Sequence, residues 1–445
     1  MALSATTVFE MRSGGSDTNG GGYVSTGTDY SQQNSPQLSV SDGACTGDTT
    51  LTSATGGFTT AMIGNLLYLS SGTERYQITA RADTNTVTID RNGPNATGMT
   101  VNVGGALASP GEFGRIQNAH AVNGFKCWIK ADGTYTLTSS SANVAGGRVA
   151  GASGRHFQME GYTTTRGDNG QATISCGAIG TITVLAATGS ATPVSYHIFF
   201  RSLKVDANGQ SSIVAFSLTG QLAMALNCHA LSCATGFSLA SNRVIRCYAE
   251  SCTTGFGGTT PQVFLSRAKG CTTGFSVGAA TALVHGCLAT GGTTGFTSGG
   301  DYQTFVNCTA YGCSGDGFDA GFSMAAINCH AEGCGGFGYD GARQTLINCG
   351  SYNNTSGRSD TGDVFQDIGA ITLSGSAFEN AAGDDFRLNA TASAGALLRA
   401  AALQLYPVGS TVGYLDVGPV QHADPAAGGG GVPIIGGNII RVHTV

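Results

Sequence analysis

Three aspartates have a spacing that could support acid–base chemistry. Asp316, Asp319 and Asp340 lie near phenylalanines that recur every 19 to 22 residues, and aligning the chain on Phe318 and Phe337 puts Asp319 and Asp340 on neighbouring turns, offset by two residues. Glycosidases use two carboxyl groups, about 5 Å apart in retaining enzymes and roughly 6.5 to 9.5 Å apart in inverting ones. Asp316 and Asp340 also adjoin glycines, and Asp-Gly is common in turns. We therefore expect no catalytic site, and keep these three aspartates as the glycosidase alternative.

The other ionisable residues form no comparable group. Glu250 and Glu332 share a position in the repeat but stand four turns apart, roughly 19 Å at the spacing of stacked strands. Lys269 is next to Glu250 in that column and predicts a surface ion pair of little energetic value. The remaining candidates have structural interpretations: His285 as a buried packing residue, Asp168 as a turn residue, and Asp360, Asp363 and Asp367 as members of a turn-like segment. We expect no metal and no cofactor.

The elements that position these residues form a repeat in residues 227–351. One column of cysteines has spacings of 19, 40, 21, 21 and 20, with Ser266 in the gap, and a second column follows five residues later. A third column is phenylalanine directly after glycine, at Phe237, Phe256, Phe275, Phe296, Phe318 and Phe337. Internal periods of this length indicate a solenoid.

Each repeat carries a short alternating segment around its first cysteine, as in Ile245, Cys247 and Ala249. Alternation with period two predicts a strand with these residues facing inward and residues such as Tyr248 facing outward. Seventy glycines, with dense Thr and Ser, oppose a helical solenoid, and no leucine framework is present for a leucine-rich repeat. The expected fold is therefore all-β, a right-handed parallel β-helix with turns of 19–22 residues.

The fourteen cysteines are expected to be packed, reduced thiols. Disulfide frameworks staple small domains that lack a core, whereas a solenoid has a continuous core. Stacked turns do bring cysteines within bonding reach, so structural disulfides stay an alternative. The replacement of cysteine by Ser266, Gly292 and Asn354 favours packing over bonding or metal binding.

Charge and composition narrow the partners. The net charge is −6 and only 11% of residues are charged, so no basic face for nucleic acid and no polybasic membrane segment is expected. The first residues lack a positive region followed by an apolar one, so no signal peptide is expected.

Four parts are predicted along the chain. Residues 1–45 are rich in Gly, Ser and Thr and predict an extended N-terminal arm; residues 46–110 contain short strands and predict a small β module. Residues 111–422 are assigned to a capping helix, based on the spacing of Phe113, Ile116, Ala119, His120 and Val122, followed by the β-helix, whose last turns include residues 370–373 and 386–388. Residues 423–445 predict a C-terminal arm.

Several segments of the sequence resemble segments of the virion-associated right-handed β-helix proteins of tailed bacteriophages. They are the opening residues 9–30, the module end at 90–93, the segment 131–135 and the segment 378–388. The resemblance implies a pectin-lyase-like β-helix, commonly assembled as a trimer, in tailspikes, fibres or capsid-decorating knobs. Its motifs mark architecture and not an activity.

From this resemblance we expect a structural virion protein, assembled in the host cytoplasm, and not an enzyme. The first expectation is a capsid decoration or cement protein forming a projecting trimeric knob. The alternative is a tailspike or tail fibre that binds, with or without cleaving, host surface polysaccharide; a non-viral adhesin is a further alternative. Expected partners are two further copies of the chain, major capsid or tail proteins, and in the alternative a host glycan.

Overall fold

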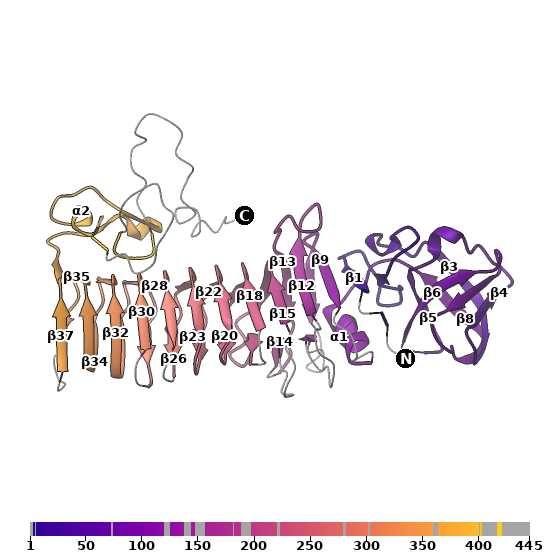
Figure 1. Ribbon diagram of the computed structural model, residues 1–445, viewed down its shortest axis with the longest axis horizontal. Helices are drawn as coiled ribbons and strands as arrows, with labels where there is room; N and C mark the ends of the chain where they lie inside the picture. The colour runs from indigo at the N-terminus through magenta and orange to yellow at the C-terminus, as the bar shows by residue number, and fades with distance from the viewer. Residues whose placement is uncertain are drawn as a thin grey trace, which may run out of the picture. The chain divides into compact units, whose positions relative to one another are not determined.

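The computed structural model describes residues 3–4, 6–72, 74–119, 125–137, 144–146, 156–180, 182–187, 197–219, 223–278, 282–300, 303–358, 364–399, 401–402 and 416–420. The chain forms two compact units, Met1–Cys228 and His229–Val445 (Figure 1). The expected C-terminal arm at 423–445, His120 and Val122 lie outside the described residues.

A closed antiparallel barrel forms the first part of the first unit. Its order is β3-β4-β7-β6-β5-β8. Alternation of buried and exposed residues, as in β4, sends one face of each strand into a core that includes Leu51, Phe58 and Val101. The strands are β3 (Leu38–Thr46), β4 (Thr50–Ser53), β5 (Leu66–Leu69), β6 (Arg75–Arg81), β7 (Thr86–Ile89) and β8 (Asn95–Val103), with short 3-10 helices at η1 (Tyr30–Gln32) and η2 (Thr60–Met62).

The N-terminal segment is partly packed, which differs from the extended arm expected for residues 1–45. β1 (Val8–Met11) pairs in parallel with β9 (Lys126–Lys130) and antiparallel with β2 (Gly22–Tyr23). Phe9 is fully buried, and its ring lies 5.3 Å from the rings of Phe113 and Phe125. The apolar β1 sequence supplies enough buried surface to dock, although the glycine-rich residues around it suggested an arm.

Parallel strands in three rows and one helix complete the first unit. The helix α1 (Pro110–Ala119) buries Phe113 and Ile116, and Phe113 stacks on Phe157 of β12 at 6.0 Å. None of the helices in the described residues is long and apolar enough to cross a membrane. The rows are β9, β12 (His156–Tyr162), β15 (His197–Arg201) and β18 (Ala223–Leu226); β11 (Val144–Gly146), β14 (Thr183–Ala187) and β17 (Val214–Leu218); and β10 (Thr134–Leu137), β13 (Ala172–Cys176) and β16 (Leu203–Asp206).

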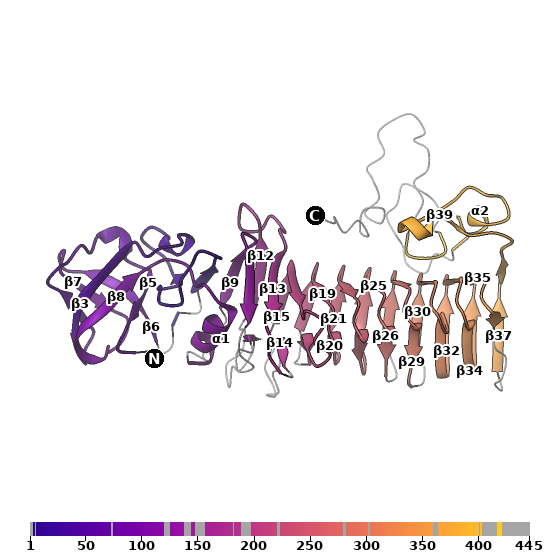
Figure 2. The ribbon, with the colours of Figure 1, turned by 180° about the vertical axis from the view of Figure 1, so that it is seen from behind.

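The second unit is a parallel β-helix, which confirms the predicted fold class (Figures 1 and 2). Each turn contributes one strand to each of three rows. The first row is β20 (Thr235–Leu239), β23 (Thr254–Gly258), β26 (Thr273–Val277), β29 (Thr294–Ser298), the starts of β32 (Phe318–Ile327) and β34 (Phe337–Ile347), and β36 (Ser356–Arg358). The second row is β21 (Arg243–Ile245), β24 (Gln262–Phe264), β27 (Leu283–His285), β30 (Gln303–Val306), the ends of β32 and β34, and β37 (Val364–Ile368). The third row is β19 (His229–Leu231), β22 (Tyr248–Glu250), β25 (Arg267–Lys269), β28 (Leu288–Thr290), β31 (Thr309–Tyr311), β33 (His330–Glu332), β35 (Gly350–Tyr352) and β38 (Ile371–Thr372).

Aromatic rings stack along the inside of the first row. Consecutive rings from Phe237 to Phe318 lie 4.6 to 4.8 Å apart with nearly parallel planes. The next ring is Tyr339, 4.9 Å from Phe318, and not Phe337 as predicted. A glycine precedes both Phe337 and Tyr339, so the glycine does not decide between them. The length of the turn does: Phe318 follows Cys313 by five residues and Tyr339 follows Cys334 by five, whereas Phe337 follows Cys334 by only three. The correct alignment therefore moves by two residues.

The cysteines fill the remaining core. All fourteen are buried, and none forms a disulfide. Most of their thiols donate to a carbonyl oxygen two residues earlier, as Cys247 does to Ile245 at 3.4 Å. Ser266 fits the first column because its hydroxyl oxygen accepts a hydrogen bond from the backbone amide of Cys247 at 3.1 Å. Burial raises the pKa of Cys308 and Cys329, which keeps these thiols protonated.

The alternation predicted around each first-column cysteine breaks at the residue before it. That residue has a positive φ, for example 53° at Arg246 and 54° at Asn328. The left-handed conformation shifts the phase, so Val244 and Cys247 face inward while Ile245 faces outward and is only partly buried. Asn tolerates this conformation well, which explains its recurrence at Asn307, Asn328 and Asn348.

A C-terminal segment covers part of the third row. β39 (Phe378–Asn380) and β40 (Asp385–Leu388) pair antiparallel around η3 (Ala381–Gly383), followed by α2 (Gly395–Leu398). Residues 386–388, expected in the last turn of the β-helix, belong to this hairpin because Asp384 adopts a left-handed turn. Tyr311 of β31 packs against Phe378 and Phe386, with ring centroids 5.9 and 5.3 Å apart.

Candidate functional site

Two aspartates lie directly side by side on the first row. Asp319 of β32 is in register with Asp340 of β34. Phe318 and Tyr339, which precede them, are fully buried, so the alternation of a strand turns both carboxyl groups outward. Neighbouring parallel strands lie about 4.8 Å apart, which is close to the separation of about 5 Å found in retaining glycosidases. The two-residue offset expected from sequence is thus absent.

The surroundings favour the protonated form of Asp319. The pKa of Asp319 is raised, first by its partial burial and then by the negative charges of Asp316 and Asp340. Within the described part of the chain, the side chains of Asp319 and Asp340 make no hydrogen bond or ion pair. A carboxyl with a raised pKa beside a second carboxyl is an arrangement that suits general acid catalysis.

The third aspartate has a structural part. Asp316 Oδ1 accepts a hydrogen bond from the backbone amide of Phe337 at 2.6 Å. This bond ties the turn before β32 to the start of β34, so Asp316 holds the two strands that carry the pair. Its charge also acts on Asp319. The residues in register with Asp319 one and two turns earlier are Thr297 and Ser276.

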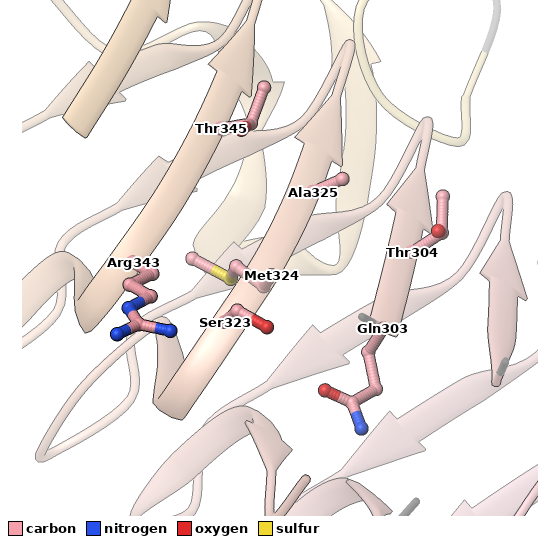
Figure 3. A pocket seen from close by; sticks show the side chains of 7 residues that line it. All are labelled: Gln303, Thr304, Ser323, Met324, Ala325, Arg343 and Thr345. Atoms are coloured by element: carbon pink, nitrogen blue, oxygen red, sulfur yellow. The ribbon is translucent and has the colours of Figure 1, made fainter. Parts of the chain in front are cut away.

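A pocket of about 360 Å³ lies on the second row of the same unit (Figure 3). β30, β32 and β34 form its wall, and Arg343 is exposed at its side. It begins three residues after Asp340 on the same strand. Its lining consists of Gln303, Thr304, Ser323, Met324, Ala325, Arg343 and Thr345.

The other glutamates of the repeat have structural partners. Glu250 pairs with His229 at 3.5 Å, whereas Lys269 pairs with Asp384, so the expected Glu250–Lys269 ion pair is replaced. Glu332 is buried beneath the C-terminal segment. It accepts hydrogen bonds from His330 at 3.0 Å, from the Ser376 hydroxyl at 2.5 Å and from the Ala377 amide at 3.0 Å.

The buried His330–Glu332 pair was missed by the sequence reasoning. Residues two apart in a strand share a face, so the sequence His330-Ala331-Glu332 contained the signal. What hid it was the expectation that the third row faces solvent. His330 is fully buried because Phe378 packs 5.5 Å from its ring.

The remaining candidates are explained by local structure. His285 faces outward, 6.3 Å from the Phe264 ring, and not into the core, because its neighbour Val284 takes the inward position; partial burial lowers the pKa of His285. The Asp168 carboxylate accepts hydrogen bonds from four backbone amides, and these bonds lower its pKa. The donors are Thr163, Thr164, Thr165 and Gly170. Asp367 pairs with Arg358, and Asp360 and Asp363 lie outside the described residues. In the described ranges, no three His, Cys, Asp or Glu side chains gather to hold a metal ion.

Comparisons with known proteins find likeness in structure only. No protein-family model and no curated protein matches the sequence. A solved structure of the pectate lyase Pel9A has a TM-score of 0.49 and 16% identity, covering 69% of this chain and 90% of that one. The catalytic domain of a GH87 α-1,3-glucanase with nigerose has a TM-score of 0.31 and 10% identity, covering 80% and 93%. The catalytic unit of a GH87 α-1,3-glucanase from Streptomyces thermodiastaticus has a TM-score of 0.30 and 10% identity, covering 75% and 88%.

This finding corrects the expectation that the protein is not an enzyme. The solved structures found are a pectate lyase and α-1,3-glucanases, which act on polysaccharides. At such low identity the similarity concerns the fold, so an activity must be argued from the residues of this chain.

Proposed function

We propose that this protein binds a polysaccharide on the outer face of its β-helix and hydrolyses a glycosidic bond at Asp319 and Asp340. The observation that carries the proposal is the in-register pair of outward carboxyl groups, one of them with a raised pKa. Two carboxyl groups at this separation suit hydrolysis with retention of configuration.

The two aspartates would have different roles. Asp319, whose raised pKa favours the protonated form, donates its proton to the glycosidic oxygen as the bond to the anomeric carbon breaks. The Asp340 carboxylate attacks that carbon and forms a glycosyl ester. Asp319, now ionised, takes a proton from water, which attacks the ester, releases Asp340 and restores both groups.

The setting proposed for this activity is a trimeric tailspike or fibre of a tailed phage acting on host surface polysaccharide. The sequence resemblance supports it, as does the outward position of the acids. Capsid decoration, the first expectation from the sequence, stays a prediction. Locating the protein on particles by electron microscopy separates the two, because a cement protein lies on the capsid and a tailspike lies on the tail.

The test compares Asp319→Asn and Asp340→Asn with Thr297→Asn, which changes the same column one turn earlier. Purified protein should release reducing ends from host polysaccharide. Each aspartate variant should lose roughly 10²-fold or more of that rate, the scale of general acid–base catalysis, while Thr297→Asn keeps it. The rate of the native protein should fall as pH rises above the pKa of Asp319, because the acid must be protonated.

Circular dichroism of each variant checks that it folds. The proposal fails if host polysaccharide is not shortened, or if folded Asp319→Asn and Asp340→Asn proteins remain as active as the native one.

A further inference from the structure

The positive charge of Arg343 has no acidic partner among the described residues. Its side chain is exposed at the side of the pocket, and across the residues that the structure describes it makes no hydrogen bond or ion pair. By contrast, Arg358 on the next turn pairs with Asp367, and Arg267 pairs with Asp384. A guanidinium offers a planar fork of donors that matches a carboxylate with two parallel hydrogen bonds.

The rest of the pocket suits a sugar. The hydroxyl groups of Thr304, Ser323 and Thr345 come from three neighbouring strands, and Met324 and Ala325 add apolar surface between them (Figure 3). Gln303 is fully buried and bonds to Ser298, which fixes its amide. None of the described lining residues is acidic.

The pocket lies on the two strands that carry the aspartates. Ser323 follows Asp319 by four residues on β32, and Arg343 follows Asp340 by three on β34. At about 3.3 Å per residue these separations are at most roughly 10 to 13 Å. A polysaccharide bound at the aspartates can therefore extend to Arg343, and we assign the group bound there to a sugar next to the one attacked.

We propose that this pocket is a subsite for an acidic sugar, whose carboxylate is held by the Arg343 guanidinium. The inference rests on the proposed function and deepens it: the substrate is a polysaccharide containing a uronic or similar carboxylated sugar. Arg343 is a positioning and specificity residue, because it contacts substrate away from the bond that breaks.

Binding is measured in the Asp319→Asn/Asp340→Asn protein, so that cleavage does not enter the result. The probes are oligogalacturonate, hyaluronan oligosaccharides and oligosialic acid, each with its carboxyl-reduced, neutral form. At least one acidic probe should bind, its reduced form should bind at least about tenfold more weakly, and Arg343→Gln should cause the same loss, the scale of a charged hydrogen bond. Arg343→Lys should restore part of the binding, and Arg246→Gln, which removes an exposed arginine elsewhere in this unit, should change nothing.

The outcomes separate the two proposals. If acidic and reduced probes bind equally, if none of the acidic probes binds, or if Arg343→Gln binds like its parent, the acidic subsite is wrong. If an acidic probe binds through Arg343 but the native protein cleaves nothing, the subsite stands and the hydrolase proposal is wrong.

Discussion

Replacing Phe275 by alanine should remove one ring from the middle of the aromatic stack. Phe275 is fully buried, and its ring lies 4.8 Å from Phe256 and 4.7 Å from Phe296. A buried Phe covers roughly 150 to 250 Å², which at about 25 cal/mol per Å² gives an upper bound of roughly 4 to 6 kcal/mol. Measured truncations of buried Phe cost about 3 to 5 kcal/mol. We therefore expect the free energy of unfolding to fall by about 3 to 5 kcal/mol.

Denaturant unfolding followed by circular dichroism measures this loss. Phe337→Ala is the matched control, since Phe337 lies on β34 of the same unit, outside the stack, and is only partly buried. It should cost clearly less than Phe275→Ala. If Phe275→Ala costs less than about 1 kcal/mol, the magnitude expected of a surface substitution, or no more than the control, the stack does not stabilise the fold as argued.

Two further predictions concern the C-terminal segment and self-association. Burial opposes ionisation of Glu332, but the hydrogen bonds and charge of His330, with the bonds from Ser376 and Ala377, outweigh it and lower its pKa below 4.5. The stability that these contacts of Glu332 add is present above pH 4.5 and is lost as pH falls through the lower folded-state pKa. The protection factors of residues 376–398, which are corrected for the intrinsic pH dependence of hydrogen exchange, should therefore fall in acid, and Glu332→Gln should abolish that fall; protection that falls equally in the variant contradicts the argument. Ile245, Phe264, Ile327 and Ile347 are outward, partly exposed residues of one column on the second row, in which His285 and Val306 stand between Phe264 and Ile327. We expect this largely apolar column to be buried between copies in a trimer. Light scattering should give a mass of three chains for the native protein and a lower mass for Ile327→Asp; a native monomer would refute trimerisation.

The strand register that pairs Asp319 with Asp340 could not be predicted from the sequence alone. Glycine-phenylalanine steps predicted a ring in every turn, and counting residues placed Phe337 in that column. The chain instead places Tyr339 there, because Tyr339 follows Cys334 by the same five residues that separate Phe318 from Cys313. That shift of two residues brings Asp340 into register with Asp319. The composition of the acid group was visible in the sequence, but its geometry was not.

The covering of the third row by the C-terminal hairpin could not be predicted from the sequence either. The repeat predicted that Tyr248, Arg267 and His330 face away from the core, and they do leave the core of the β-helix. The hairpin of β39 and β40 then covers two of them, through Phe378 against His330 and through Asp384 against Arg267. A contact between segments over 100 residues apart, such as Arg267 with Asp384, has no periodic signal in the sequence.

The sequence by itself determined the parallel β-helix, the inward cysteine and aromatic columns and the small β module, because each turn repeats the same local requirements of strand, turn and packing. Only the tertiary structure decided which residues stand side by side and which faces are covered. The physical reason is that turns of unequal length absorb extra residues, so register is set by steric fit between neighbouring turns. The paired aspartates, the pocket beside Arg343 and the buried Glu332 all depend on that fit.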